Sequence, residues 1–249
     1  MALITKNIKP TAALSDFVES YWMLHNASDE EKEVILLPDG RIDLFFSSSG
    51  TESFHVTIIG LGTLPTRATI APQTLTFAIS FNLLATEYIL HQSVAGIVDS
   101  ALDLPADFWG FTATDLHDFD LFCRKASQKI TTLLPASMDE RKRTLFQLIY
   151  STNGAMTVKA LSEKVFWSSR QINRYFSRQY GLSLKSYCMI LLFRASFQHI
   201  KAGKLFPEQD FTDQSHFIKA VKKLAGVSPK ELNRNQNDRF IQFSLLPGK

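Results

Sequence analysis

One stretch of the sequence, from Ser168 to Gly181, combines side chains that can read DNA. In a helix, Arg170, Asn173 and Arg174 share one face, and the apolar side chains of the stretch face the other way. Arginine can form two hydrogen bonds to guanine O6 and N7, and asparagine can form two to adenine N6 and N7. The stretch therefore indicates a recognition helix for the major groove of duplex DNA.

The residues around this stretch predict where the helix begins and ends. Ser168 followed by Gln171 is a capping-box pattern, and Gly181 is the residue type that ends helices in a left-handed conformation. Upstream, Thr157 opens a short stretch with apolar residues at helical spacing, and the link FWSS leaves room only for a tight turn. The pattern predicts a helix, a turn and a second helix.

The same chemistry recurs 45 residues further along the chain. Each copy has a cap, an apolar anchor, a basic residue two positions later, a terminal glycine and a serine that opens the next helix. The aligned pairs are Ser168 with Asp213, Ile172 with Phe217, Arg174 with Lys219, Phe176 with Val221, Arg178 with Lys223, Gly181 with Gly226, and Ser183 with Ser228. This duplication predicts two helix-turn-helix units.

Charge is unevenly divided along the 249 residues. Residues 156–249 contain 16 Lys and Arg against 6 Asp and Glu, whereas residues 1–155 contain 11 against 18. The basic part is the part with the duplicated motif. A basic module attracts phosphates and releases counterions when it binds DNA, so the charge distribution favours a nucleic-acid partner.

The segment from about Thr157 to Leu232 resembles the C-terminal region of the AraC/XylS family of bacterial transcription regulators. The matching motifs are ALSEKV, SSRQINRYFSRQYGLSLKSY and FTDQSHFIKAVKKLAGVSPKEL. The resemblance implies two helix-turn-helix units joined by a long helix, here expected from Ser183 to about Lys201. It implies double-stranded DNA as partner, with RNA polymerase, a small-molecule effector and a second copy of the chain as further partners.

We assign roles to ten residues of the two units on this basis. Arg170, Asn173 and Arg174 are expected to contact bases, and Ser169, Gln171 and Arg178 to contact or position against phosphates. The corresponding residues of the second unit are Gln214, Ser215, His216 and Lys219. The segment GKLFPEQD, Gly203 to Asp210, is shorter than its counterpart in the family, contains proline and lacks the family's glycine. A full supporting helix is therefore not expected there.

The N-terminal half shows strand signals first and helix signals later. Residues 11–25 have apolar residues at near-helical spacing, and residues 34–37 and 42–46 predict a hairpin around Pro38 to Arg41. Further strands are expected over 54–61, 67–70 and 75–81, and helices over 83–92, 114–134 and 138–150. The predicted fold class is α+β: an N-terminal β-rich barrel or sandwich with helices over residues 1–135, then an all-α double helix-turn-helix domain over 136–249.

The stretches YW, LPDG and FAISF are similar to a sensor-like N-terminal segment found in some AraC-type regulators. In that family such a domain often binds a small effector or dimerises. By this analogy we expect an effector inside the β-rich domain, lined by Phe45, Phe77 and Phe81. Aromatic side chains at strand spacing are also common core residues.

Enzymatic, metal-binding and membrane classes receive little support. The six histidines are scattered, and the nearest acidic cluster, Asp115, His117, Asp118 and Asp120, is more typical of a helix start than of a metal site. No P-loop, dinucleotide glycine motif or nucleophile elbow occurs. No catalytic residue, metal or cofactor is expected. With two cysteines, no long apolar run and no hydrophobic leader, we expect a cytoplasmic protein.

The sequence is also consistent with two alternative functions. The first is a divergent relative whose shortened second unit no longer reads DNA and which acts through protein partners. The second is a ligand-binding or enzymatic β domain with an accessory DNA-binding tail. The segment from Gly203 to Asp210 bears on the first, and a bound ligand or metal would favour the second.

Overall fold

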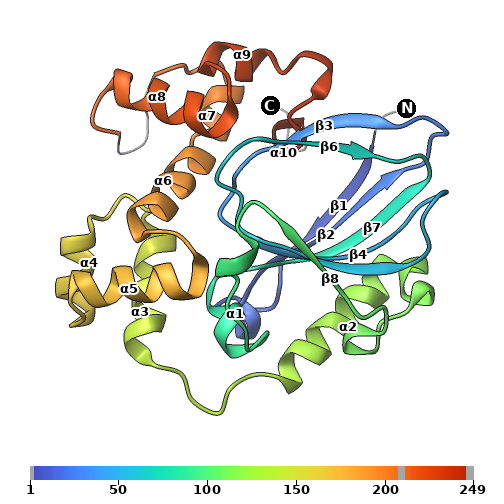
Figure 1. The fold of residues 1–249 in the computed structure, drawn as a ribbon, viewed down its shortest axis with the longest axis horizontal. Helices are drawn as coiled ribbons and strands as arrows, with labels where there is room; N and C mark the ends of the chain where they lie inside the picture. Colours follow the sequence, from blue (N-terminus) through green and yellow to red (C-terminus); the bar gives the residue numbers. More distant parts are fainter. Residues whose placement is uncertain (1–2, 207–210, 245–249) are drawn as a thin grey trace. The chain divides into compact units, whose positions relative to one another are not determined.

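The structure of the protein is a computed structural model that describes residues 3–206 and 211–244. The chain forms two compact units. The first comprises residues 1–32, 41–60 and 69–139, and the second comprises residues 33–40, 61–68 and 140–249. Two short segments of the N-terminal half thus belong to the unit that contains the C-terminal helices. A β-sheet region followed by a helical region confirms the predicted fold class (Figure 1).

The first unit is built on a six-stranded antiparallel sheet with the order β1-β2-β7-β4-β5-β8 (Figure 1). Alternate side chains along each strand point to opposite faces, so the sheet presents two chemically different surfaces. The strands are β1 Ile4–Ile8, β2 Val18–Asn26, β4 Ile42–Ser48, β5 His55–Ile59, β7 Thr74–Phe81 and β8 Ala101–Leu104.

Helix α2, Phe119–Thr132, covers the apolar face of this sheet. Its Phe122 ring lies 5.2 Å from the ring of Phe46 on β4 and 5.4 Å from that of Phe77 on β7. The helix begins at Asp118, whose carboxylate accepts hydrogen bonds from two backbone N–H groups of the first turn. The cap satisfies donors that would otherwise lack partners and suits the helix dipole.

In the N-terminal half, the near-helical spacing of residues 11–25 does not correspond to a long helix, and the predicted hairpin is wrong. Residues 11–25 form the short 3-10 helix η1, Ala12–Leu14, followed by strand β2. The expected hairpin does not form, because β3, Lys32–Leu36, pairs with β6, Thr66–Ile70, whereas β4 pairs with β5 and β7. The turn at Pro38 to Arg41 exists, with Gly40 in the left-handed region at φ 78°, but it links strands of different sheets.

The other predicted elements of this half are present with altered ends. Strands β5, β6 and β7 match the expected strands closely. Helix α1 is limited to Leu84–Tyr88, and the helix expected over 114–134 is divided at Asp118 into the 3-10 helix η4, Ala113–His117, and α2. Strands β1 and β8 and the 3-10 helices η2, Ala95–Ile97, and η3, Phe108–Gly110, were not predicted.

The second unit contains the helices of the two predicted helix-turn-helix units (Figure 1). A buried apolar cluster built around Phe193, Phe217 and Leu232 forms the core of its second half. The helices are α3 Glu140–Ser151, α4 Val158–Val165, α5 Ser169–Tyr180, α6 Leu184–Ala195, α7 Phe197–Lys201, α8 Gln214–Ala225, α9 Pro229–Arg234, η5 Gln236–Asp238 and α10 Ile241–Ser244.

The joining helix is shorter than expected, because it is interrupted at Ser196. Helix α6 ends at Ala195, and the Ser196 hydroxyl donates a hydrogen bond of 2.6 Å to the carbonyl of Phe193. A serine hydroxyl that bonds back to the preceding turn competes with the helical ladder and favours a break. The five-residue helix α7 follows in place of the rest of the expected helix.

Both cysteines are buried packing residues. The exposed fraction is 7% for Cys123 on α2 and for Cys188 on α6, and burial raises the pKa of each thiol to about 12. Because the thiolate is the reactive form, we expect alkylation at pH 8 to be roughly a thousandfold slower than for a free cysteine. Timed alkylation with mass spectrometry measures this, and unfolding in urea should restore the ordinary rate. Fast labelling of the folded protein would contradict the expectation.

Candidate nucleic-acid interface

The first helix-turn-helix unit is formed by α4 and α5, each with a defined start and stop. Thr157 caps α4, and α4 ends at Phe166 in the left-handed region at φ 51°. At the start of α5, the hydroxyl of Ser168 accepts from the N–H of Gln171, and the side-chain oxygen of Gln171 accepts from the N–H of Ser168 at 3.0 Å. Helix α5 ends at Gly181, with φ 73°. The predicted capping box and glycine stop are confirmed.

Aromatic packing fixes which face of α5 is turned outward. Phe176 and Tyr180 are buried, and their rings lie 5.6 Å and 6.0 Å from that of Phe146 on α3. Ile172 is also buried. Since the apolar face of α5 is held against α3, the opposite face is left to solvent.

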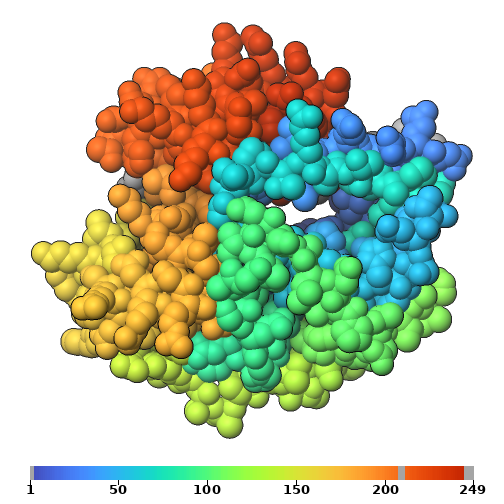
Figure 2. Space-filling model, in the orientation of Figure 1, coloured from blue at the N-terminus to red at the C-terminus, as the bar shows by residue number. Residues whose placement is uncertain are grey.

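The exposed face of α5 carries the arginines that the sequence singled out. Arg170, Arg174 and Arg178 are all exposed. Asn173 is half-buried, and its side-chain nitrogen donates to the carbonyl of Ser169 at 3.0 Å. The atoms of α4 and α5, yellow to light orange, form part of the visible surface (Figure 2). The three arginine side chains are thus open to solvent, whereas the side chain of Asn173 is bonded within its own helix.

Two other predicted contact residues of the first unit have local roles as well. The side-chain oxygen of Gln171 accepts from both the N–H and the hydroxyl of Ser168, at 3.0 Å and 2.7 Å. Its amide nitrogen is the part of the side chain that can donate to a phosphate. Ser169 is half-buried in the first turn of α5, where helix N-terminal N–H groups favour anions.

Helix α8 repeats this construction in the second unit. Asp213 accepts from the N–H of His216 at 2.7 Å, and the helix ends at Gly226 with φ 71°. Lys219 is exposed, as are Gln214 and Ser215. His216 is half-buried, with its ring centroid 5.6 Å from that of Phe211. Three of the four predicted contact residues are thus open to solvent, and His216 packs partly against its own unit.

The support for α8 differs from that for α5. Helix α7 ends at Lys201, and the described residues 202–206 that follow it are not helical. Residues 207–210 of the shortened segment, including its proline, lie outside the part of the chain that the structure describes. The core behind α8 includes Leu37, from the N-terminal half of the sequence.

Two cations beside α5 were not predicted from the sequence. Arg141 lies over the ring of Trp167 at 5.6 Å, and Lys142 lies over the ring of Tyr175 at 4.8 Å. Both cations, from the start of α3, therefore lie against aromatic rings of the first unit. The sequence feature that could have indicated them is the basic run Arg141-Lys142-Arg143, which precedes an apolar stretch with helical spacing.

The cap of α5 gives a test of how the first unit is held. Replacing Ser168 by alanine should lower the free energy of unfolding by about 1 kcal/mol, because it removes the acceptor for a backbone N–H of the first turn. Threonine at the same position should restore most of the loss. Urea unfolding followed by circular dichroism measures both, and an unchanged alanine variant would mean that the cap contributes no stability.

The three phenylalanines expected around an effector do not share a site. Phe77 and Phe81 are buried on the apolar face of the sheet, where Phe77 lies 5.1 Å from Phe119 and Phe81 lies 6.2 Å from Trp109, ring to ring. Phe45 pairs with Ala78 of β7 and points to the opposite face. Of the three phenylalanines expected around an effector, only Phe45 therefore lies on the second face of the sheet.

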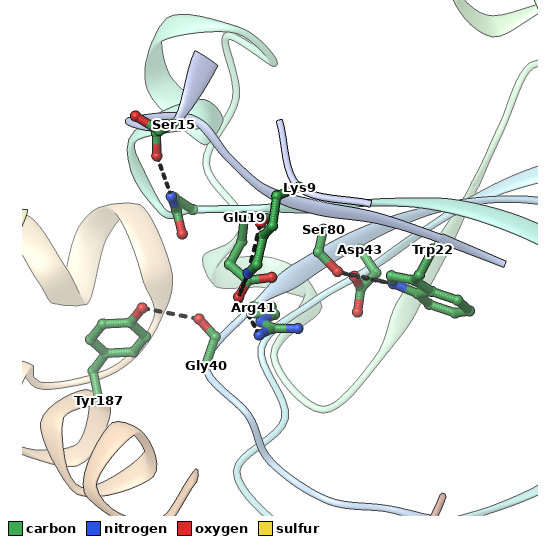
Figure 3. A network of polar contacts seen from close by, with 10 residues as sticks. Lys9, Ser15, Glu19, Trp22, Gly40, Arg41, Asp43, Ser80 and Tyr187 are labelled. Carbon is green, nitrogen blue, oxygen red and sulfur yellow. Dashed lines mark hydrogen bonds and ion pairs between the residues drawn. The ribbon is translucent and has the colours of Figure 1, made fainter. Parts of the chain in front are cut away.

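The second face of the sheet is polar around Phe45. The ring of Trp22 stands edge-on to that of Phe45 at 5.1 Å, and its indole N–H donates to Ser80 at 3.0 Å. The hydroxyl of Ser80 in turn donates to the carboxylate of Asp43 (Figure 3). An aromatic pair beside a carboxylate can hold a small polar or cationic molecule.

The acidic cluster near α2 is used in separate local contacts. Lys125 donates to Asp115 at 2.8 Å, and Lys6 donates to Asp120 at 2.7 Å. Burial alone would raise the pKa of Asp115, but Lys125 and Thr112 outweigh it and lower that pKa. Among the described residues, no group of three or more His, Cys, Asp or Glu has the arrangement of a metal site. Within residues 3–206 and 211–244, no helix is long and apolar enough to cross a bilayer.

Comparisons with known proteins give a domain match and remote structural similarities. Residues 6–103 match a family described as Domain of unknown function (DUF6597). No curated protein matches the chain in sequence. Two crystal structures of ToxT from Vibrio cholerae, each 10% identical, align with TM-scores of 0.48 and 0.46. They cover 86% and 93% of this chain and 97% of each ToxT chain. Similarity at this level assigns neither a family nor a ligand.

Proposed function

We propose that the protein is a sequence-specific DNA-binding transcription regulator of the AraC type. One observation carries the proposal: α5 and α8 are each twelve residues long, each begins at a side-chain cap, and each ends at a left-handed glycine. Each is followed by a helix that a serine caps. Two copies of one helix, both with exposed cations, suit two major-groove segments of the same duplex.

Within this proposal, the exposed arginines of the first unit do most of the sequence reading. Arg170 and Arg174 project from one face of α5 and can each form two hydrogen bonds to a guanine. Asn173 reads adenine once its bond to Ser169 is released. Contacts to phosphates then set the register of the protein on the duplex; the proposed groups are Ser169, Gln171 and Arg178 in the first unit, with Gln214, Ser215, His216 and Lys219 serving the second.

A small effector in the N-terminal unit is the second part of the proposal. Trp22, Asp43 and Phe45 offer an indole, a carboxylate and an aromatic edge on the polar face of the sheet. Phe77 and Phe81 are not proposed as ligand contacts, because they are packed in the core under α2 and η3. RNA polymerase, a second copy of the chain and a cytoplasmic location stay predictions from the sequence, and no catalytic role is proposed.

The test is selection of bound DNA from a random duplex library with the purified full-length protein. We expect enrichment of a bipartite motif with two boxes about one helical turn apart, because the two units address successive major-groove segments. Lys185→Ala, an exposed basic residue of α6 outside both recognition helices, is the matched control and should enrich the same motif.

The other outcomes of the selection distinguish the alternatives. A single short box would mean that only the α5 unit reads sequence. Enrichment no greater than salt-sensitive background would refute the proposed function for the protein as purified, and would favour the divergent relative that acts through protein partners.

A further inference from the structure

Strand β3 belongs to a two-stranded sheet, so one of its edges is left for another partner. On one side it pairs with β6. On the other side the N–H of Ile35 donates to the carbonyl of Arg239 at 2.6 Å. The N–H of Leu37 donates to the side-chain oxygen of Gln242 at 2.9 Å, and the amide nitrogen of Gln242 donates back to the carbonyl of Leu37, also at 2.9 Å. The segment around α10 thus lies along this side of β3 (Figure 1).

The side chains of this segment enter the core behind the second recognition helix. Leu37 is buried, with an exposed fraction of 4%, in the apolar cluster that contains Phe217, Val221 and Leu224 of α8. Ile35 packs against the same cluster. The hydrogen bonds of Ile35 and Leu37 thus reach the segment that follows α9, and their side chains pack in the core behind α8.

The end of the segment is fixed on helix α6. The hydroxyl of Tyr187 donates to the carbonyl of Gly40 at 3.0 Å in a buried contact (Figure 3). A methyl group on Gly40 would lie only 2.9 Å from the side chain of Leu191, and Gly40 also needs its left-handed φ of 78°. The left-handed backbone conformation favours glycine at this position, and the Leu191 side chain would have to shift to admit a larger residue.

We propose that residues 33–40 brace the second helix-turn-helix unit, in place of the supporting helix that is cut short after Lys201. Gln242 and Leu37 are its main positioning residues, since they join the brace to the helical core by two hydrogen bonds and by burial. The inference rests on the proposed function in one respect, that α8 reads DNA. The inference goes beyond that function because DNA reading by α8 would depend on residues of the N-terminal half. Those residues would then provide a physical means to control DNA reading.

The experiment compares Gln242→Leu with the wild type in the full-length protein. Leucine keeps most of the side-chain volume and removes both hydrogen bonds to Leu37. Gln236→Leu is the matched control, because Gln236 is exposed in η5 and the substitution is the same. Amide hydrogen exchange is followed separately in α5 and α8, and binding is measured on two duplexes that each carry one of the selected boxes.

We expect exchange in α8 to become about tenfold faster in Gln242→Leu and binding to the second box to weaken about tenfold, with α5 and the first box changed less than about twofold. The control should match the wild type. No change in α8, or equal changes in α5 and α8, would overturn the brace. If the wild type selects no DNA, the proposed function fails, and the exchange measurement alone still decides whether residues 33–40 hold α8.

Discussion

Arg174→Ala should weaken specific DNA binding by about 1–3 kcal/mol, because it removes a side chain that can form two hydrogen bonds to one guanine. Arg174 is exposed on α5, and its helix is fixed by the capping box of Ser168 and by packing on Phe146. The fold should therefore tolerate the change. Binding to the selected operator, measured by fluorescence anisotropy at fixed salt, gives the value.

The salt dependence and the sequence preference show what kind of contact is lost. A base contact should leave the slope of affinity against salt nearly unchanged and should relax selectivity at one position of the first box. Lys185→Ala serves again as the control outside the interface. Unchanged affinity for the operator would remove Arg174 from the residues that read bases.

Arg41→Met should destabilise the N-terminal unit by about 3–5 kcal/mol, because it leaves the Glu19 carboxylate buried without its main counter-charge. The guanidinium of Arg41 lies 2.6 Å from Glu19, and the exposed fraction of both side chains is 17%. Lys9 also contacts Glu19 at 2.8 Å (Figure 3). Since Lys9 remains in the variant, the lower end of the range is expected. Urea unfolding by circular dichroism measures the loss.

The pH dependence of this pair has a definite sign. Burial raises the pKa of Glu19, but Arg41 and Lys9 outweigh it, so the pKa lies below the ordinary glutamate value of 4.5. In the wild type, Glu19 therefore contributes stability above that value, and the contribution is lost as the pH falls through the lowered pKa. In Arg41→Met the attraction of Arg41 is absent, so the pKa of Glu19 should be higher than in the wild type, and acidification should cost the variant less stability than it costs the wild type.

A second substitution isolates the charge from the packing. Arg41→Met combined with Glu19→Gln removes both charges and should recover most of the stability lost in the single variant. If the double variant is as unstable as Arg41→Met alone, the loss comes from the packing of the Arg41 stem, and the ion pair is not its cause.

Local chemistry explains which parts of the fold were predictable. The caps at Ser168, Asp213 and Ser228 and the stops at Gly181 and Gly226 depend on residues three to thirteen positions apart, and each was found where expected. Capping hydrogen bonds are formed within one turn of helix. The pattern of residue types is therefore sufficient to locate them.

Strand partners were not predictable, because they depend on distant residues. Residues 11–25 have side chains buried on both faces of β2, so the simple alternation that marks a half-buried strand is absent. The hairpin prediction failed because a good turn at Gly40 does not specify which strands pair. For β3, the partners are β6 and residues 239–242.

The residues of the candidate sites were likewise predictable where helical spacing decides their position, and not where strand register decides it. The arginines of α5 could be assigned from helical spacing, since packing against Phe146 leaves a single outward face. The effector residues required the strand register: Phe45 lies opposite Ala78, and its neighbour Phe46 lies opposite Phe77. One residue along a strand changes the face of the sheet, so sequence alone could not place Phe45 and Phe77 together or apart.

The pairing of Leu37 with Gln242 also affects how the protein is made. These residues are 205 positions apart, so on the ribosome the outer edge of β3 emerges long before its partner. An uncovered strand edge is a template for pairing with other chains. The nascent protein must therefore pass through synthesis with an aggregation-prone edge, and a chain cut before residue 239 would keep that edge open permanently.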